Sequence, residues 1–403
     1  MRVVVVGAGP SGMMASITSA KEGNQVILID KNEKLGKKLF ITGKGRCNIT
    51  NNCDNKTFLD NVVSNPKFLM SAINAFNTSD TMAFFENSGL KLKVERGNRV
   101  FPFSDKSSDV IKAFEKELIK NNVDIRLNTK ALEIIAQNNK VEGIKTDKGI
   151  LLCDKLIIAT GGVSYPITGS TGDGYELAKK LNHTITPLLP ALVGINLKEE
   201  WISNLAGLSL KNVALSVIRD GKVIASDFGE MLFTHNGVSG PIVLSLSSKI
   251  NKQKGNLKIM LDLKPSLSIE QLDNRILRDF EENKNKEFKN VIDSITVKAL
   301  VPYIIQKSNI SPTKKVNSIT KVERERLVYT IKNFEFSIDS LCGIASGIVT
   351  SGGISTKEIN PKNMASKLIE GLHFCGEVID VDALTGGYNI QIAMSTGYLA
   401  GLN

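Results

Sequence analysis

Apolar and mixed segments alternate along the first thirty residues in the order strand, helix, strand. Residues 2–6 are an arginine followed by four valines, which is typical of a strand buried on both faces. Residues 13–22 have helical character, and a Gly-Asn pair separates them from a second apolar strand at residues 25–29. Two parallel strands and their crossover helix need about this length. The pattern predicts a βαβ unit at the start of an α/β domain.

Further along the chain, the pattern changes twice. Between residues 100 and 160 it predicts one amphipathic helix and four strands, at residues 109–120, 124–127, 131–137, 141–146 and 155–159. Residues 191–263 form short alternating strands with Gly and Asn turns, which indicates an antiparallel or barrel-like segment. Residues 265–327 are highly charged and helical in pattern, and Ser268 is placed to cap the first helix. Strands at residues 334–338 and 372–376 and a helix at residues 389–400 complete the chain.

Composition is that of an ordinary globular protein. Of 403 residues, 42% are hydrophobic and 23% are charged, which excludes a wholly disordered chain. The length suits two or three domains at ~150 residues each, and no stretch approaches the ~20 apolar residues of a membrane span. Five cysteines, an odd number without paired spacing, argue against a disulfide framework. We therefore expect a protein of the reducing cytoplasm.

The strongest chemical signal is the glycine triplet between the first strand and its helix. Gly7 allows the tight turn, Gly9 lets the backbone approach a pyrophosphate, and Gly12 permits close packing of helix on strand. The helix N-terminus then directs its free N–H groups and its positive dipole end at the phosphates. Asp30, at the tip of the second strand, is placed to accept hydrogen bonds from an adenosine ribose. The sequence predicts a dinucleotide site.

Two features near the C-terminus favour a flavin over a nicotinamide as the dinucleotide. Glu377 follows an apolar strand, where an acid can bind ribityl hydroxyls, and Gly387 opens the last helix. A helix N-terminus at that point can stabilise the negative charge that a flavin ring gains on reduction. No second Gly-x-Gly-x-x-Gly follows a strand. If NADH or NADPH is the reductant, it must therefore dock directly against the flavin.

Several further segments carry a family resemblance. They are GKKLFITGKGRCNITN at 36–51, RVFP at 99–102, ATGG at 159–162, SYP at 164–166, GSTGDG at 169–174, FTHNGVSGP at 233–241, GEVID at 376–380 and GYN at 387–389. Together they resemble a bacterial FAD-dependent oxidoreductase family that includes BaiN-like bile-acid and steroid enone reductases and an aminoacetone oxidase. The segments extend over nearly the whole chain, and they are specific for the family and not for a substrate.

The resemblance implies the fold class α/β, with a Rossmann-type FAD-binding domain split by a β-barrel-like insert that itself carries a small helical cap. We expect the FAD-binding domain at residues 1–190 and 346–403. The barrel-like domain is expected at residues 191–264 with a return strand at 330–345, and the helical cap at residues 265–329.

Motif and resemblance together give a set of expected cofactor-binding residues for non-covalent FAD. The set is Gly7, Gly9, Pro10, Ser11, Gly12, Asp30, Lys31, Lys38, Gly45, Arg46, Cys47, Asn48, Ala131, Thr160, Gly161, Gly376, Glu377, Gly387, Asn389 and Ile390. Asp30 departs mildly from the family type, which commonly has Glu there, and the shorter acid can still reach one ribose hydroxyl. Cys47 has no partner at C-x-x-C spacing, so we expect a packing thiol. Three dispersed histidines predict no metal site.

The leading functional hypothesis is an ene reductase that acts on a steroid-like or bile-acid-like enone. Such an enzyme must polarise the substrate carbonyl and supply a proton to the α-carbon. Tyr388 is the candidate catalytic acid because its motif places it beside the flavin, although its ring could equally serve only for packing. Arg46, Arg99 and Tyr165 are weaker candidates for lining the pocket. An oxidase of small amines or aminoketones that uses oxygen is an alternative.

A third hypothesis, an RNA-associated flavoprotein, arises from the charge. Lys and Arg exceed Asp and Glu by 10 (51 against 41), and such an excess can attract nucleic acid or acidic lipid. The excess is not focused in one run or interleaved with aromatic residues. We therefore expect charge scattered over solvated faces, a small and apolar substrate, and no nucleic-acid partner. The sequence does not indicate the oligomeric state.

Overall fold

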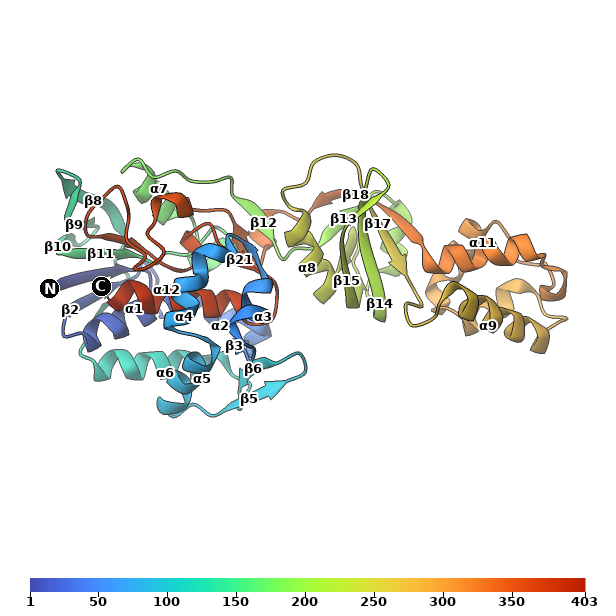
Figure 1. Ribbon diagram of the computed structural model, residues 1–403, viewed down its shortest axis with the longest axis horizontal. Helices are drawn as coiled ribbons and strands as arrows, with labels where there is room; N and C mark the ends of the chain where they lie inside the picture. Colours follow the sequence, from blue (N-terminus) through green and yellow to red (C-terminus); the bar gives the residue numbers. More distant parts are fainter. Residues whose placement is uncertain (403) are drawn as a thin grey trace. The chain divides into compact units, whose positions relative to one another are not determined.

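The computed structural model describes residues 1–402, and the chain divides into two compact units (Figure 1). Unit 1 comprises Met1–Ala191 and Gly343–Asn403, and unit 2 comprises Leu192–Cys342. The first unit is thus built from both ends of the chain, as the expected split of the Rossmann-type domain requires.

A five-stranded parallel sheet forms the centre of unit 1. Its strands lie in the order β20 (Leu372–Phe374), β11 (Lys155–Ile158), β1 (Arg2–Val6), β2 (Gln25–Ile29) and β7 (Asp124–Arg126). The four valines of β1 are at most 5% exposed, which explains the unbroken apolar run. The predicted last strand ends at Phe374 instead of residue 376, because Gly376 has a φ of +76° and begins a short 3-10 turn.

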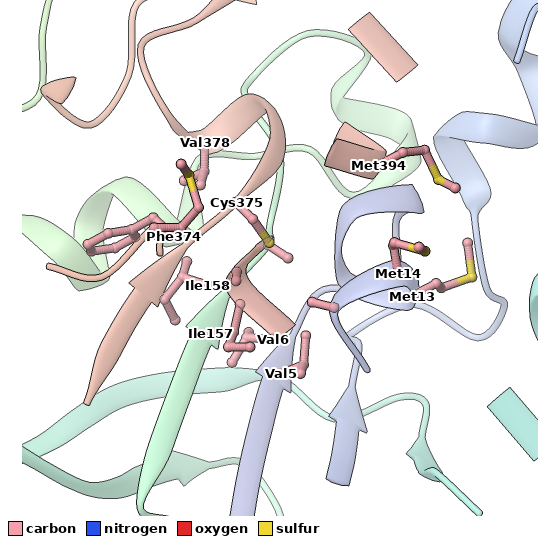
Figure 2. Close-up of a cluster of buried hydrophobic side chains, with 14 of the residues drawn as sticks. Val5, Val6, Met13, Met14, Ile157, Ile158, Phe374, Cys375, Val378 and Met394 are labelled. Carbon is pink, nitrogen blue, oxygen red and sulfur yellow. The ribbon is translucent and has the colours of Figure 1, made fainter. Parts of the chain in front are cut away.

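Two helices from opposite ends of the chain lie side by side, and the N-terminal one packs against this sheet (Figure 1). They are α1 (Pro10–Lys21) and α12 (Tyr388–Leu402). Two glycines permit the close approach: a Cβ on Gly397 would lie 2.3 Å from the Ser11 carbonyl oxygen, and one on Gly401 would lie 2.6 Å from that of Ala15. Figure 2 shows methionines of both helices gathered with strand residues such as Val5 and Ile157 in the core.

Smaller sheets and helices surround the parallel sheet in unit 1. The antiparallel sheets are β3 (Thr50–Asn51) with β6 (Arg99–Pro102) and β5 (Leu92–Glu95); β8 (Ala131–Gln137) with β9 (Lys140–Thr146) and β10 (Gly149–Leu152); β12 (Leu189–Ala191) with β19 (Val349–Ser351); and β4 (Val62–Ser64) with β21 (Asp382–Ala383). The remaining helices are α2 (Lys37–Ile41), α3 (Asn55–Asp60), α4 (Met70–Ala75), α5 (Thr78–Asn87), α6 (Ser107–Lys120) and α7 (Asp173–Lys179).

Unit 2 is a closed barrel with helices inserted between its strands. The barrel strands, in spatial order, are β13 (Ile195–Leu197), β16 (Gly237–Ser239), β15 (Lys222–Phe233), β14 (Ser209–Arg219), β17 (Leu257–Asp262) and β18 (Phe334–Leu341). The helices are α8 (Pro241–Ile250), α9 (Ile269–Glu282), α10 (Val301–Ser308) and α11 (Lys321–Lys332). Ser268 caps α9 through a capping box with Gln271, as predicted. One apolar core runs through barrel and helices.

These observations confirm the expected fold class, a Rossmann-type α/β domain interrupted by a barrel with helices inserted between its strands. The parallel sheet followed from its buried β-branched runs, and the barrel followed from its alternating strands. Among residues 1–402, no helix combines the length and the apolar character that crossing a bilayer requires.

Candidate cofactor and active site

A long cavity opens in unit 1 at the carboxyl ends of β1, β2 and β11, where ligands bind in sheets of this type. Among the residues expected to bind the cofactor, those that line the cavity are Gly7, Gly9, Pro10, Ser11, Asp30, Lys31, Lys38, Ala131, Thr160, Gly161, Glu377, Asn389 and Ile390. They come from seven separate segments of the chain. The fold therefore gathers most of the predicted set around one space.

The glycine turn between β1 and α1 has two glycines that serve packing and one that faces the cavity. Gly7 has a φ of +107°, and a Cβ there would lie 2.5 Å from the Ala159 carbonyl oxygen. A Cβ on Gly12 would lie 1.8 Å from the Gly7 carbonyl oxygen. A Cβ on Gly9 would meet no atom within 4 Å, so open space adjoins this residue. No side chain caps the helix, and its first N–H groups are available to a phosphate.

Asp30 is fixed by the backbone at one end of the cavity. Its carboxylate accepts hydrogen bonds from the N–H groups of Ala8 at 2.6 Å and Asn32 at 2.8 Å, so it ties the glycine turn to the end of β2. Lys31 donates from Nζ to Asp173 and Thr171, both at 2.5 Å. Two bonds leave lone pairs of the Asp30 carboxylate free for a ribose hydroxyl. This geometry agrees with the predicted adenosine end of the site.

A network centred on Glu377 lies elsewhere along the cavity wall. Lys38 Nζ donates to the two Glu377 carboxylate oxygens at 2.8 and 3.0 Å, and it also donates to Ser164 Oγ at 2.7 Å. Glu377 Oε1 further accepts from Ser164 Oγ at 3.1 Å and from the Thr350 N–H at 2.8 Å. These four contacts use most of the acceptor capacity of the carboxylate. The three bonds from Lys38 match the three N–H groups of its ammonium and hold it at the cavity wall.

The loop that contains Gly45, Arg46, Cys47 and Asn48 lies outside the set of cavity-lining residues, although Thr42 at its start belongs to that set. Lys44 and Cys47 have φ values of 57° and 60°, which is unusual for residues with a side chain. Cys47 is fully buried, and burial raises the pKa of its thiol to about 12, as a packing thiol would show. The buried Asn48 Oδ1 has no hydrogen-bond partner among the described residues.

Arg46 faces two carboxylates and an aromatic ring. Its guanidinium pairs with Glu95 and Asp105, both at 2.5 Å, and lies 4.3 Å from the centroid of the Phe101 ring. The bonds to Glu95 and then to Asp105 raise the pKa of Arg46. The structure thus shows Arg46 clamping the loop onto the β5–β6 hairpin, and a direct contact with cofactor stays a prediction.

At and shortly before the N-terminus of α12, the predicted residues pack closely against other segments of unit 1. Gly387 has a φ of 96°, and a Cβ there would lie 2.4 Å from the Thr50 carbonyl oxygen. Gly376 adjoins the glycine turn, since its Cβ would lie 2.4 Å from Ser11 Oγ. Asn389 lines the cavity, but its amide is bonded to the backbone N–H and C=O of Ala383 at 2.9 and 2.8 Å. The contacts shown give these residues a structural role in the cavity wall, and their contact with a ligand stays a prediction.

Tyr388, the candidate acid, does not line the cavity. It is 7% exposed, and its ring packs edge-on against Phe58 with centroids 5.4 Å apart. Burial raises the pKa of the phenol to about 12, so the hydroxyl is protonated at neutral pH. A proton donor must be in that state, and Tyr388 adjoins two cavity-lining residues in sequence. Its catalytic role stays a prediction.

Sequence reasoning missed a second loop that borders the adenosine end. Thr168, Gly169 and Ser170 line the cavity, and the Asn32 amide donates to the Thr168 carbonyl oxygen at 3.1 Å. Together with Lys31 and its partner Asp173, these contacts tie two distant segments together. The signal that could have found them was present, because residues 169–174 form one of the family segments. Ile348 and Val349 were also missed, as apolar residues without a motif.

The residues around the cavity fit FAD. Open space adjoins Gly9 at an uncapped helix N-terminus, which suits a pyrophosphate. Asp30 has acceptor capacity left for a ribose, and the buried Thr160 Oγ1 lacks a hydrogen-bond partner within residues 1–402. Lys38 and Glu377 provide polar groups beyond the turn, followed by apolar residues such as Ile390. FAD, whose polar ribose, pyrophosphate and ribityl groups join an adenine to a flavin ring, suits this combination of polar and apolar groups.

Comparison with known proteins agrees with this fit. Residues 1–403 match the family model described as "HI0933-like protein Rossmann domain". The chain is 30% identical over 405 residues to the 3-dehydro-bile acid delta(4,6)-reductase of Clostridium scindens, covering 99% of this chain and 98% of that protein. It is 29% identical over 408 residues to the ribosomal RNA dihydrouridine synthase of Haemophilus influenzae, covering 99% of this chain and 97% of that protein.

A solved structure shows the same fold at low sequence identity. The 3-ketosteroid-delta4-(5alpha)-dehydrogenase of Rhodococcus jostii, in complex with 4-androstene-3,17-dione, superimposes with a TM-score of 0.54 at 12% identity, covering 99% of this chain and 95% of that one. The chain belongs to the HI0933-like family, and it is an FAD-dependent oxidoreductase. The predicted family resemblance and the predicted cofactor are thereby confirmed.

Proposed function

We propose that this enzyme reduces a carbon–carbon double bond that is conjugated to a carbonyl group. The supporting observation is that two full-length relatives carry names that denote this one type of bond change. A delta(4,6)-reductase of a 3-dehydro-bile acid acts on double bonds conjugated to a ketone. Dihydrouridine differs from uridine by saturation of the C5=C6 bond, which is conjugated to the C4 carbonyl. The substrates differ, but the reacting group is the same.

When bound in this cavity and reduced, FAD would supply the hydride that the β-carbon of such a group accepts. The residues of this chain have to hold the cofactor, exclude water and provide a proton. Lys38 and Glu377 fix one wall of the cavity, and the turn from Gly7 to Gly12 fixes another. We assign delivery of the proton to the α-carbon to Tyr388, whose protonated phenol lies at the start of α12.

We propose NADH or NADPH as the source of electrons. The chain has one glycine motif of the dinucleotide type, and that motif faces the FAD cavity. A nicotinamide cofactor would therefore have to react in the pocket that the substrate also uses, in alternation with it. This arrangement implies competition between reductant and substrate, which steady-state kinetics can detect.

The first candidate substrate is a steroid-like or bile-acid-like enone. The relative from Clostridium scindens supports it, since its name specifies a 3-dehydro-bile acid and the match extends over 98% of its length. An apolar, flat substrate would lie against the ring of the flavin, where burial of apolar surface contributes ~25 cal/mol per Å².

The second candidate substrate is a uridine within RNA. The relative from Haemophilus influenzae supports it at nearly the same identity and coverage, and the net charge of +10 suits a polyanionic substrate. The expectation from sequence that nucleic acid is not a partner therefore has no support from the relatives. An RNA substrate would require a surface for phosphate groups on the outside of the protein.

One anaerobic experiment tests the proposal. The purified FAD enzyme is reduced with one equivalent of NADH or NADPH and then mixed with a steroid 4-en-3-one, a uridine-containing ribosomal RNA transcript or oxygen, while flavin absorbance is followed. We expect reoxidation by one of the two conjugated acceptors, with a product heavier by two hydrogens in mass spectrometry. Reoxidation by oxygen alone, with no reduced product, would support the oxidase alternative and overturn the proposal.

A further inference from the structure

Two segments of unit 1 that are about fifty residues apart in sequence form one basic surface. The first is the end of α2 with the loop that follows it, at residues 40–46. The second runs from the β5–β6 hairpin to the start of α6, at residues 91–112. Ser107 Oγ donates to the Phe40 carbonyl oxygen at 2.6 Å, which fixes the loop beside α6. Figure 1 shows β5 and β6 at the edge of unit 1, away from the parallel sheet.

Two acidic side chains of this region, Glu95 and Asp105, form salt bridges with cations of the same region. Glu95 pairs with Arg46 at 2.5 Å and with Lys93 at 3.5 Å, while Asp105 pairs with both cations at 2.5 Å. Bonds from Lys93 and Arg46 hold the pKa of the Asp105 carboxyl below its usual value, so the carboxylate stays ionised and paired. The two acids therefore do not offset the cations that point outward.

The outward cations are exposed and free of acidic partners. None of them forms a salt bridge with any residue in the described part of the chain, 1–402. We call these residues the basic face: Lys44, Lys91, Arg96, Arg99 and Lys106. Two exposed aromatic rings lie among them, Phe40 at 55% and Phe103 at 67% exposure. Neither ring is buried in the core, so core packing does not explain why these two positions are aromatic.

A shallow hollow beside Phe103 extends the basic face. Lys91, Lys112 and Lys116 line it, together with Asp109, which lies 3.7 Å from Lys112. Lys116 is held by the Ser88 carbonyl oxygen at 3.1 Å. An exposed ring with lysines around it offers a base a stacking surface and offers the adjoining phosphates positive charge. Stacking of one base contributes about 1–3 kcal/mol.

We propose that the basic face, with Phe40 and Phe103, is the docking surface for the phosphate backbone of a folded RNA. The proposal rests on the second candidate substrate, and it concerns a surface that the FAD cavity does not include. The loop that carries Lys44 begins at Thr42, which lines the cavity, so RNA held on this face is connected to the cofactor through one short segment. Five exposed cations without acidic partners on two adjoining segments are the observation that carries it.

Fluorescence anisotropy with a labelled, uridine-containing RNA stem-loop tests the surface directly. The variant Lys44→Glu/Arg96→Glu/Lys106→Glu reverses three exposed charges, none of which lines the cavity. We expect wild-type binding that weakens with salt, and at least about tenfold weaker binding by the variant. The slope of log affinity against log salt should fall by about 2, since single strands lose ~0.7 per phosphate contact. Phe103→Ala should weaken binding at unchanged slope.

The matched control reverses three exposed lysines elsewhere on unit 1, in Lys130→Glu/Lys145→Glu/Lys362→Glu. It makes the same change in net charge, so equal loss of RNA binding by both triple variants would overturn the proposal. Equal binding of wild type and basic-face variant would do so too, as would binding to phosphatidylglycerol vesicles without RNA binding. FAD content and reduction of a small enone are measured separately. If the wild-type protein bound no FAD or did not reduce the enone, the proposed function would be contradicted. The RNA-binding measurement could still be interpreted.

Discussion

Lys38 and Glu377 lie 339 residues apart in the chain, and their side chains meet on the cavity wall with Lys38 Nζ 2.8 Å from the carboxylate. Neither side chain is fully exposed, at 24% and 21%. Because Ser164 and the Thr350 N–H also bind Glu377, the carboxylate has little capacity left for a ligand. We infer that Glu377 acts mainly by holding the Lys38 ammonium in place at the cavity wall.

The first prediction concerns this pair as a unit. Lys38→Met and Glu377→Gln should each weaken FAD binding by roughly tenfold. A charge-assisted hydrogen bond contributes about 1.5–3 kcal/mol, and each substitution should remove part of that contribution. The double variant should be little weaker than either single one, because each change already breaks the same interaction. Quenching of flavin fluorescence on titration of the apoprotein measures the affinity. Additive losses would indicate that the two side chains bind FAD independently.

The second prediction separates the glycines of the turn. Gly9→Ala should leave the apoprotein as stable as wild type, because its Cβ meets no atom and its φ of −77° is ordinary. It should weaken FAD binding, since the methyl group enters the space we assign to the pyrophosphate. Gly12→Ala is the matched comparison, and it should fail to fold because its Cβ would lie 1.8 Å from the Gly7 carbonyl oxygen. Thermal unfolding of the apoproteins and FAD titration distinguish the two.

Local patterns in the sequence predicted most of the architecture. The valines of β1 and the glycine turn specify the first βαβ unit, because a doubly buried strand and a tight turn leave few alternatives. The barrel followed from alternating strands with Gly and Asn turns. The short sheets at β3, β5 and β6 did not follow, since strands of two to four residues carry too little periodicity to be recognised.

The site was predicted where a motif carries its own geometry, and missed where distant segments meet. Gly7 and Asp30 define positions through the turn and the strand end. The partner of Lys38 could not be inferred, because nothing local in residues 36–51 specifies Glu377. The proposed basic face could not be inferred from the sequence for the same reason. Lys44 and Arg96 lie far apart in the sequence, and contacts such as those of Arg46 with Glu95 and Asp105 bring their segments together.

The third prediction tests the assignment of Tyr388. Tyr388→Phe should retain FAD with near-normal affinity, because the ring keeps its contact with Phe58 at 5.4 Å. Turnover should fall by about 100-fold or more, which is the typical contribution of a general acid. With a phenol pKa near 12, wild-type turnover should not change through ionisation of this group between pH 6 and 9. Rapid-reaction kinetics of the oxidative step give the rate, and an unchanged rate would leave the ring a packing role only.

The last prediction concerns Lys155, which β11 places in the core. The residue is 3% exposed, and its ammonium has no hydrogen-bond partner among residues 1–402. Burial lowers the pKa of Lys155 to about 8, and burial together with the charge of Lys155 lowers that of His373 to about 3. A buried amine without a partner destabilises the folded state as long as it is protonated. Lys155→Met keeps the apolar stem and removes that charge, so it should raise stability.

The sign of the pH dependence follows from linkage. An unfolded lysine keeps its proton up to its ordinary pKa of 10.5, whereas the folded protein releases it from Lys155 near pH 8. Between these values the unfolded state binds more protons, so wild-type stability rises with pH, and below pH 8 the full penalty is present. At pH 7, Lys155→Met should therefore raise the midpoint of thermal FAD release by about 2–6 °C, for a gain of roughly 1–2 kcal/mol. The gain should shrink between pH 8 and 9.5, while exposed Lys145→Met, the matched control, should change little at either pH. A Lys155→Met variant that releases FAD earlier than wild type at pH 7 would show that the ammonium has a stabilising partner instead.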